Sequence, residues 1–241
     1  MTHMPSPTQK VALITGASRG IGKQLSIDLA RMGYTTILVG RSKDHLEQTA
    51  REIQEMGQRQ TMIRTVDITD SDQINKMVDE VISKYGRIDI LVNNAGIHAR
   101  GTLDLTGDEF RKLLEVNITG QFLVARAVVP VMKNQGSGYI FNIASRSAKV
   151  GFAGTGGYCS SKWGLLGLSE SLYRELTPLG IKVTALCPAW VDTEMADRAG
   201  SPLDPTERIR PEDLSETMKW LINLSSGACV KEVVITNPMS L

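Results

Sequence analysis

Short apolar runs alternate with amphipathic segments along almost the whole chain. Each run is mostly apolar and β-branched and ends at glycine or polar residues, which is typical of a strand buried on both faces of a sheet. The predicted strands are Val11–Thr15, Thr35–Val39, Met62–Val66, Ile88–Val92, Tyr139–Ile143, Ile181–Leu186 and Val230–Ile235.

Between these runs, apolar residues recur at helical spacing. The predicted helices are Ile21–Met32, Lys43–Met56, Asp70–Tyr85, Glu109–Met132, Tyr158–Leu176 and Glu212–Leu224. A crossover between parallel neighbours needs a helix, so this alternation predicts a Rossmann-type doubly wound α/β fold with a seven-stranded parallel sheet covered on both faces. No linker or repeat divides the chain, so we expect one domain over residues 10–241 after a flexible tail, residues 1–9. Residues 195–210, with glycine, proline and mixed charge, predict a substrate loop.

Composition excludes several functional classes. The 241 residues hold 27 basic and 26 acidic side chains, so no broad positive surface for nucleic acid or anionic membrane is expected. No uninterrupted apolar run is long enough to span a bilayer, and the first residues lack the apolar core of a signal peptide, which favours a cytoplasmic protein. The three cysteines, Cys159, Cys187 and Cys229, are widely spaced in apolar surroundings, so we expect core residues and neither a disulfide nor a metal site.

The first predicted strand runs directly into a glycine-rich turn that opens a helix, Thr15-Gly-Ala-Ser-Arg-Gly-Ile-Gly22. Glycines at 16, 20 and 22 let the backbone turn tightly and approach a pyrophosphate, and the helix N-terminus offers free N–H groups to the anion. A tight turn without a ligand would show the same glycines. The order of strand, glycines and helix at the start of an alternating chain favours a dinucleotide.

The second predicted strand ends at Gly40-Arg41-Ser42, without the carboxylate that would hold an adenosine 2′-hydroxyl. Arg41, together with Arg19 of the glycine turn, suits the 2′-phosphate of NADP(H), because guanidinium groups bind phosphate through paired charge-assisted hydrogen bonds. The alternative is that both are solvated surface arginines.

Tyr158 and Lys162 stand four residues apart on a predicted helix, so their side chains point the same way. A neighbouring ammonium favours the phenolate and makes proton exchange by Tyr158 accessible. Ser145, thirteen residues earlier at the carboxyl end of a strand, could donate a hydrogen bond to the same substrate oxygen. A lone Tyr-x-x-x-Lys would indicate only a helix surface; the serine shifts the interpretation toward catalysis.

Asn117 falls on the apolar face of the long predicted helix. A buried asparagine needs hydrogen-bond partners. It either satisfies a neighbouring backbone group or disturbs the helix and holds a water behind Lys162.

Together these features resemble the short-chain dehydrogenase/reductase family, in its shorter, single-domain branch. The matching segments are Thr15–Gly22, Asp67–Asp70, Asn93–Gly96, Asn117, Ser145, Tyr158–Lys162 and Pro188–Thr193. The resemblance implies that Tyr158 is the acid/base, Ser145 orients the carbonyl, Lys162 holds the nicotinamide ribose and lowers the Tyr158 pKa, and Asn117 anchors a relay water. It further implies NADP(H) contacts from Gly16, Ser18, Arg19, Gly20, Ile21, Gly22, Arg41, Ser42, Asp67, Ile68, Asn94, Ala95, Gly96, Tyr158, Lys162, Pro188, Val191 and Thr193.

The resemblance implies an NADP(H)-dependent oxidoreductase that interconverts a ketone and a secondary alcohol. One alternative is a 3-oxoacyl-[acyl-carrier-protein] reductase acting on an acyl thioester; the glycine turn resembles that subgroup, whereas the C-terminal run 231–235 lacks its glycine-rich ending. A non-catalytic dinucleotide sensor is the alternative outside catalysis.

The sequence leaves the substrate open. The expected pocket residues are Arg146, Ser147, Lys149, Phe152, Trp190 and the segment 195–210. The aromatic side chains favour an apolar substrate part, and Arg146 and Lys149 could either meet an anion or form a solvated rim. Relatives pair the two longest helices, which are apolar over more than one stripe, so we expect a homodimer or homotetramer.

Overall fold

A computed structural model of the chain describes residues 9–57 and 60–238. Seven parallel strands form one sheet in the order β3-β2-β1-β4-β5-β6-β7. The strands are β1 (Val11–Thr15), β2 (Thr35–Gly40), β3 (Thr61–Thr65), β4 (Ile90–Asn93), β5 (Gly138–Ile143), β6 (Ile181–Pro188) and β7 (Glu232–Ile235). The structure confirms the predicted doubly wound α/β fold.

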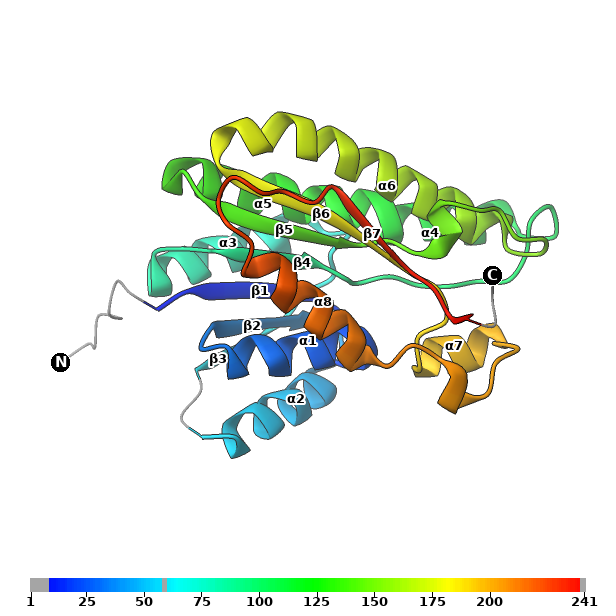
Figure 1. Cartoon of the computed structure of the whole chain (residues 1–241), viewed down its shortest axis with the longest axis horizontal. Coiled ribbons are helices and arrows are strands. Elements are labelled where there is room, and N and C mark those ends of the chain that lie inside the picture. Colours follow the sequence, from blue (N-terminus) through cyan, green and yellow to red (C-terminus); the bar gives the residue numbers. More distant parts are fainter. Residues whose placement is uncertain (1–8, 58–59, 239–241) are drawn as a thin grey trace.

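Helices cover both faces of this sheet. They are α1 (Gly20–Arg31), α2 (Lys43–Glu55), α3 (Ser71–Tyr85), α4 (Gly107–Leu114), α5 (Gly120–Gln135), α6 (Gly156–Leu176), α7 (Glu194–Ala199) and α8 (Pro211–Ile222). Figure 1 shows α1, α2 and α8 on one face, with α3, α4, α5 and α6 on the other. Neighbouring strand residues alternate between two cores: Ile14 and Phe141 pack on the α1 side, Leu13 and Ile140 on the α5 side.

Two elements differ from the sequence prediction. The single long helix expected over Glu109–Met132 is two α-helices joined by a π-helical turn, Glu115–Thr119, which carries the buried Asn117. The segment 195–210, expected as a loop, contains most of α7 and a 3₁₀ turn, Pro205–Glu207. Thr193 caps α7 by accepting a hydrogen bond from the Ala196 N–H, a local signal that apolar periodicity does not report.

The stretch Gly107–Gln135 is long and apolar enough to cross a membrane, judged by length and composition alone. Its α5 part packs against the sheet and α3. The predicted tail lies outside the described residues except for Gln9 and remains a prediction.

Candidate active site

The strand order places one crevice at the carboxyl end of the sheet. β1 lies between β2 and β4, so the chain leaves β1 and β4 toward different sides, which opens a ligand crevice outside the strand ends. Hydrogen bonds join the loops after these two strands. The Asn94 amide donates to the carbonyls of Thr15 (3.0 Å) and Gly16 (3.2 Å), and the Thr15 hydroxyl accepts from the backbone N–H groups of Asn94 and Ala95, at 3.0 Å each.

The glycine turn requires its glycines for different reasons. Gly16 and Gly20 adopt positive φ angles of 66° and 53°, which side chains disfavour. A Cβ at Gly22 would lie 2.2 Å from the Gly16 carbonyl oxygen and 2.4 Å from the Asn94 amide nitrogen. The turn before α1 therefore exposes backbone without Cβ atoms at these positions, which leaves room for a pyrophosphate to approach the backbone N–H groups.

A cavity of about 310 Å³ lies beside the end of β2. Its lining comprises Arg41, Asp67, Thr69, Arg111, Lys112, Glu115 and Val116. The Asp67 carboxylate accepts hydrogen bonds from the Thr69 N–H (3.0 Å) and hydroxyl (2.8 Å), which with the Arg41 charge lower its pKa despite partial burial. The cavity therefore combines an ionised acid with a guanidinium at the end predicted to hold the adenosine.

Other predicted cofactor residues surround this crevice. Ser18 lies with its hydroxyl near Gly40, Ser42 precedes α2, and Ile68 packs against Gly120. On the opposite side Pro188 ends β6, and Val191 is bridged to Ile209.

Arg19 forms an ion pair with α7, and its side chain is 58% exposed. Its guanidinium pairs with Glu194 of α7, Nη1 to Oε2, at 2.6 Å. Next to it, a Cβ at Gly20 would lie 3.2 Å from the Thr193 methyl group. The glycine turn and the start of α7 therefore touch, so the cofactor crevice is bordered by α7.

Ser145, Tyr158 and Lys162 come together at the carboxyl end of β5. The Ser145 hydroxyl is hydrogen-bonded to Tyr158 and accepts from the Ser147 N–H at 3.1 Å. The Lys162 Nζ donates to the Ile143 carbonyl at 2.8 Å and lies 5.7 Å from the centre of the Tyr158 ring.

Burial dominates the pKa values of this group. Desolvation raises the pKa of Tyr158 to about 12, against a smaller lowering by the Ser145 hydrogen bond, and lowers the pKa of Lys162 to about 8. In the chain by itself, burial therefore favours the neutral form of both groups. The resemblance implies that Lys162 lowers the Tyr158 pKa, but Lys162 is not among the groups that shift this pKa in the structure.

Asn117 is fully buried in the π-helical turn and links the loop after β4 to α6 through hydrogen bonds. Its amide donates to the Ile97 carbonyl and the Ser161 hydroxyl, both at 2.9 Å, and its carbonyl accepts from the Ile97 N–H at 2.8 Å. A Cβ at Gly96 would meet this carbonyl at 3.2 Å and the Lys162 Nζ at 3.8 Å. Asn117 thus satisfies a neighbouring backbone and interrupts the helix; its relay water remains a prediction.

The structure places His98 on Tyr158 and Arg100 two residues further along the same loop, and neither residue was predicted from the sequence. The imidazole of His98 packs on the Tyr158 ring, with ring centres 4.8 Å apart and planes tilted by 58°. Burial and the Arg100 charge lower the His98 pKa, so the ring is neutral at pH 7. The sequence signal that could have identified these two residues is their position shortly after the Asn93–Gly96 motif.

Of the predicted pocket cations, Lys149 is engaged elsewhere, paired with Glu232 at 3.0 Å. Arg146 lies over the Phe152 ring, 5.5 Å from its centre.

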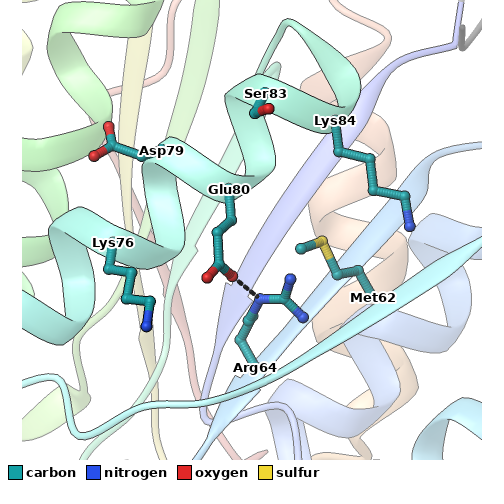
Figure 2. A pocket seen from close by; sticks show the side chains of 7 residues that line it. All are labelled: Met62, Arg64, Lys76, Asp79, Glu80, Ser83 and Lys84. Carbon is teal, nitrogen blue, oxygen red and sulfur yellow. Dashed lines mark ion pairs between the residues drawn. The ribbon is translucent and has the colours of Figure 1, made fainter.

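A larger hollow of about 610 Å³ lies on the outer edge of the sheet, between β3 and α3 (Figure 2). It is lined by Met62, Arg64, Lys76, Asp79, Glu80, Ser83 and Lys84. Arg64 and Glu80 form an ion pair at 2.7 Å, and Figure 2 shows the two side chains facing each other. This hollow is at the edge strand, away from the carboxyl end of β5, and contains none of the predicted catalytic residues.

Comparison with known proteins assigns the chain to a family. Residues 10–204 match the family described as short chain dehydrogenase. The uncharacterized oxidoreductase YxjF of Bacillus subtilis is 38% identical over 227 residues, which cover 93% of this chain and 88% of that protein. 

Two solved structures show the same fold over nearly the full length. The β-ketoacyl-[ACP] reductase FabG from Bacteroides thetaiotaomicron is 42% identical, with a TM-score of 0.86 and coverage of 97% of this chain and 99% of that one. A variant of actinorhodin polyketide ketoreductase, solved with NADPH, is 29% identical, with a TM-score of 0.89 and coverage of 97% and 98%. The chain belongs to the short-chain dehydrogenase family and is an oxidoreductase with a nicotinamide dinucleotide as its cofactor.

Proposed function

We propose that this protein is an NADP(H)-dependent oxidoreductase that interconverts a ketone and a secondary alcohol, with Tyr158 as general acid/base. The observation that carries the proposal is the hydrogen bond between Ser145 and Tyr158 above the buried Lys162, beside the glycine cradle. The two hydroxyls can meet one substrate oxygen, which is the arrangement that proton transfer to a carbonyl requires.

Each catalytic residue has a distinct task in this proposal. NADP(H), when bound, supplies or accepts the hydride. Ser145 orients the substrate oxygen, and in the reducing direction Tyr158 gives that oxygen its proton. A tyrosine with a raised pKa holds its proton at neutral pH, so the resting form is the donor form. Lys162, one helical turn away, would stabilise the phenolate left behind and hold the nicotinamide ribose.

The same crevice has groups for the rest of the cofactor. The bare backbone at Gly16, Gly20 and Gly22 would take the pyrophosphate, and Asp67 the adenine amino group. Arg41 would bind the 2′-phosphate, so the phosphorylated cofactor is favoured over NAD(H). The NADPH in the actinorhodin ketoreductase structure supports this preference.

The second candidate is a 3-oxoacyl-[acyl-carrier-protein] reductase. The 42% identity to the FabG of Bacteroides thetaiotaomicron supports it. Against it stands the C-terminal run 231–235, which lacks the glycine-rich ending of that subgroup. An acetoacetyl thioester as substrate distinguishes this candidate from a reductase of free ketones.

The test is NADPH oxidation by purified protein with neutral diketones and an acetoacetyl thioester. Tyr158→Phe keeps the ring and removes one hydroxyl, so turnover should fall by roughly 10²–10⁴-fold while NADPH affinity changes little. Ser145→Ala should also lower turnover, with a milder effect on cofactor affinity. Near-native turnover in Tyr158→Phe contradicts the mechanism, and NADPH binding without turnover of any carbonyl supports the sensor.

We further propose a cytoplasmic location and a homodimer or homotetramer. Cys159, Cys187 and Cys229 are all free, which agrees with a reducing compartment.

A further inference from the structure

We propose that the substrate is an oxo acid, whose carboxylate binds to Arg100 and His98 while its carbonyl meets Tyr158. This inference rests on the proposed function, because it assigns the substrate class of the same site. It follows from the position of one loop, residues 97–102, between the catalytic tyrosine and α7.

Hydrogen bonds hold this loop against the segment that leads into Tyr158. The Gly101 N–H donates to the Gly154 carbonyl at 2.7 Å, and the Gly156 N–H donates to the Thr102 hydroxyl at 3.0 Å. The Gly157 N–H in turn donates to the Gly101 carbonyl at 3.3 Å. The loop is therefore fixed in place beside the acid/base, which explains how His98 can pack on its ring.

Arg100 extends from this loop toward the end of α7. A Cβ at Gly200, the residue that ends α7, would lie 2.8 Å from the Arg100 Nη2. The positive charge of Arg100 also lowers the pKa of the His98 imidazole, two residues earlier in the loop. The guanidinium thus lies beside the end of α7, and its charge reaches the His98 ring that packs on Tyr158.

The carboxylates around α7 are already paired with other arginines. Within the described residues, Glu194 pairs with Arg19 and Arg198, and Asp192 and Asp197 both pair with Arg208. No ion pair of Arg100 occurs among the described residues. Arg100 therefore keeps a positive charge that a substrate can use.

A carboxylate is the anion that fits this pair best. A planar guanidinium binds it through two parallel charge-assisted hydrogen bonds, and the neutral imidazole of His98 adds one donor without a competing charge. A neutral ketone makes neither contact. The site should therefore select substrates by their charge as well as by their carbonyl.

The experiment compares oxo acids with their own methyl esters, for instance 3-oxobutanoate and 4-oxopentanoate, in NADPH oxidation. Wild-type protein should prefer the acid, and Arg100→Gln should lower the acid-to-ester ratio of kcat/KM by roughly 10- to 100-fold, the effect of a hydrogen bond to a charged group. Arg100→Lys should restore part of the ratio. Arg51→Gln, on the exposed side of α2, is the matched control and should leave the ratio unchanged.

A second readout does not depend on turnover. With NADP⁺ present, which has no hydride to transfer to the ketone, the acid should raise the melting temperature of the wild type and not of Arg100→Gln. The melting temperature of Arg100→Gln by itself also reports whether this variant folds. If acid and ester are reduced equally, or if Arg100→Gln keeps the wild-type ratio, the oxo-acid inference is overturned. The proposed function still stands in that case, provided that reduction of the ketone in the methyl ester depends on Tyr158. If no carbonyl is reduced at all, the proposed function fails and the inference fails with it.

Discussion

Tyr158 and Lys162 lie one helical turn apart on α6, and burial moves their pKa values in opposite directions, each toward the neutral form. The consequence differs for the two residues. A neutral tyrosine is ready to donate a proton, whereas a lysine with a pKa of about 8 costs folding free energy whenever it is charged. This cost should be visible in how the stability of the protein depends on pH.

Lys162→Met should remove a pH-dependent part of the stability. The Lys162 pKa is about 8 in the folded protein and near 10.5 in the unfolded chain, so between these values the unfolded state binds more protons and the free energy of unfolding rises with pH. The wild-type-minus-variant difference should rise by up to about 1.4 kcal/mol between pH 8 and pH 9, measured by urea unfolding. A difference that stays constant over this range contradicts the buried-lysine assignment.

Arg41→Asp should change the preferred cofactor. The substitution removes the phosphate contact and offers the 2′-hydroxyl an acceptor, so the ratio of kcat/KM for NADPH over NADH should fall by at least about 10-fold. Steady-state kinetics with both cofactors checks this, and Lys43→Asp, at the exposed first residue of α2, controls for a general change of charge. Equal specificity in wild type for both cofactors contradicts the role of Arg41.

The elements that hold the site are joined at the strand ends by hydrogen bonds between side chains and backbone groups. The loops after β1 and β4 meet through Asn94, and the π-helical turn between α4 and α5 presents Asn117 to the loop after β4. A π-helical turn adds one residue to the helical repeat and often occurs at functional sites. Here it lets the helix continue along the sheet while one polar side chain faces inward.

Gly22→Ala should disrupt the packing of the glycine turn against Asn94, in the loop after β4. The new Cβ would lie 2.2 Å from the Gly16 carbonyl oxygen, so one of the two backbones must move, at a cost of roughly 1–3 kcal/mol of stability and a loss of NADPH affinity. Thermal unfolding and cofactor titration measure both effects. Gly227→Ala, where a Cβ meets nothing within 4 Å, is the control and should stay within about 0.5 kcal/mol of wild type.

On the scale of the whole molecule, apolar side chains remain uncovered along α5 and α6. Fewer than half of the residues in the most apolar part of Gly107–Gln135 are buried in the single chain. Phe122 and Trp163 are 43% and 50% exposed, and Ile118, one turn before Phe122, packs against Gly164, the neighbour of Trp163. These two aromatic side chains therefore border one continuous α5–α6 surface, which a second copy of the chain would cover.

Light scattering should give two or four times the 26.3 kDa mass of one chain. Phe122→Asp places a charge in the proposed interface, so it should shift the protein toward the monomer and leave the helical circular dichroism intact. Trp220→Asp, at an exposed aromatic position on α8, gives the comparison and tests whether a second surface takes part in assembly. A wild-type protein of monomer mass at assay concentration would overturn the interface.

The strands and most helices could be predicted because local patterns determine them. Runs such as Val11–Thr15 are mostly apolar since both of their faces are buried, and the side chain of Asp70, the residue before α3, caps that helix. The glycine turn and the Tyr158–Lys162 pair could be predicted for the same reason: a turn or a helix fixes the spacing, and the spacing is visible in the sequence.

The apolar periodicity of the chain fixes the alternation of strands and helices, and through it the parallel sheet and the crevice at its carboxyl edge. Folding alone brings together the distant side chains at that crevice: His98 on Tyr158, Arg19 on Glu194, and Arg100 at the end of α7. Long-range contacts depend on how loops of different strands pack, and no local periodicity records that packing. The shifted pKa values of Tyr158 and Lys162 likewise could not be predicted from the sequence, because burial causes both shifts and arises only on folding.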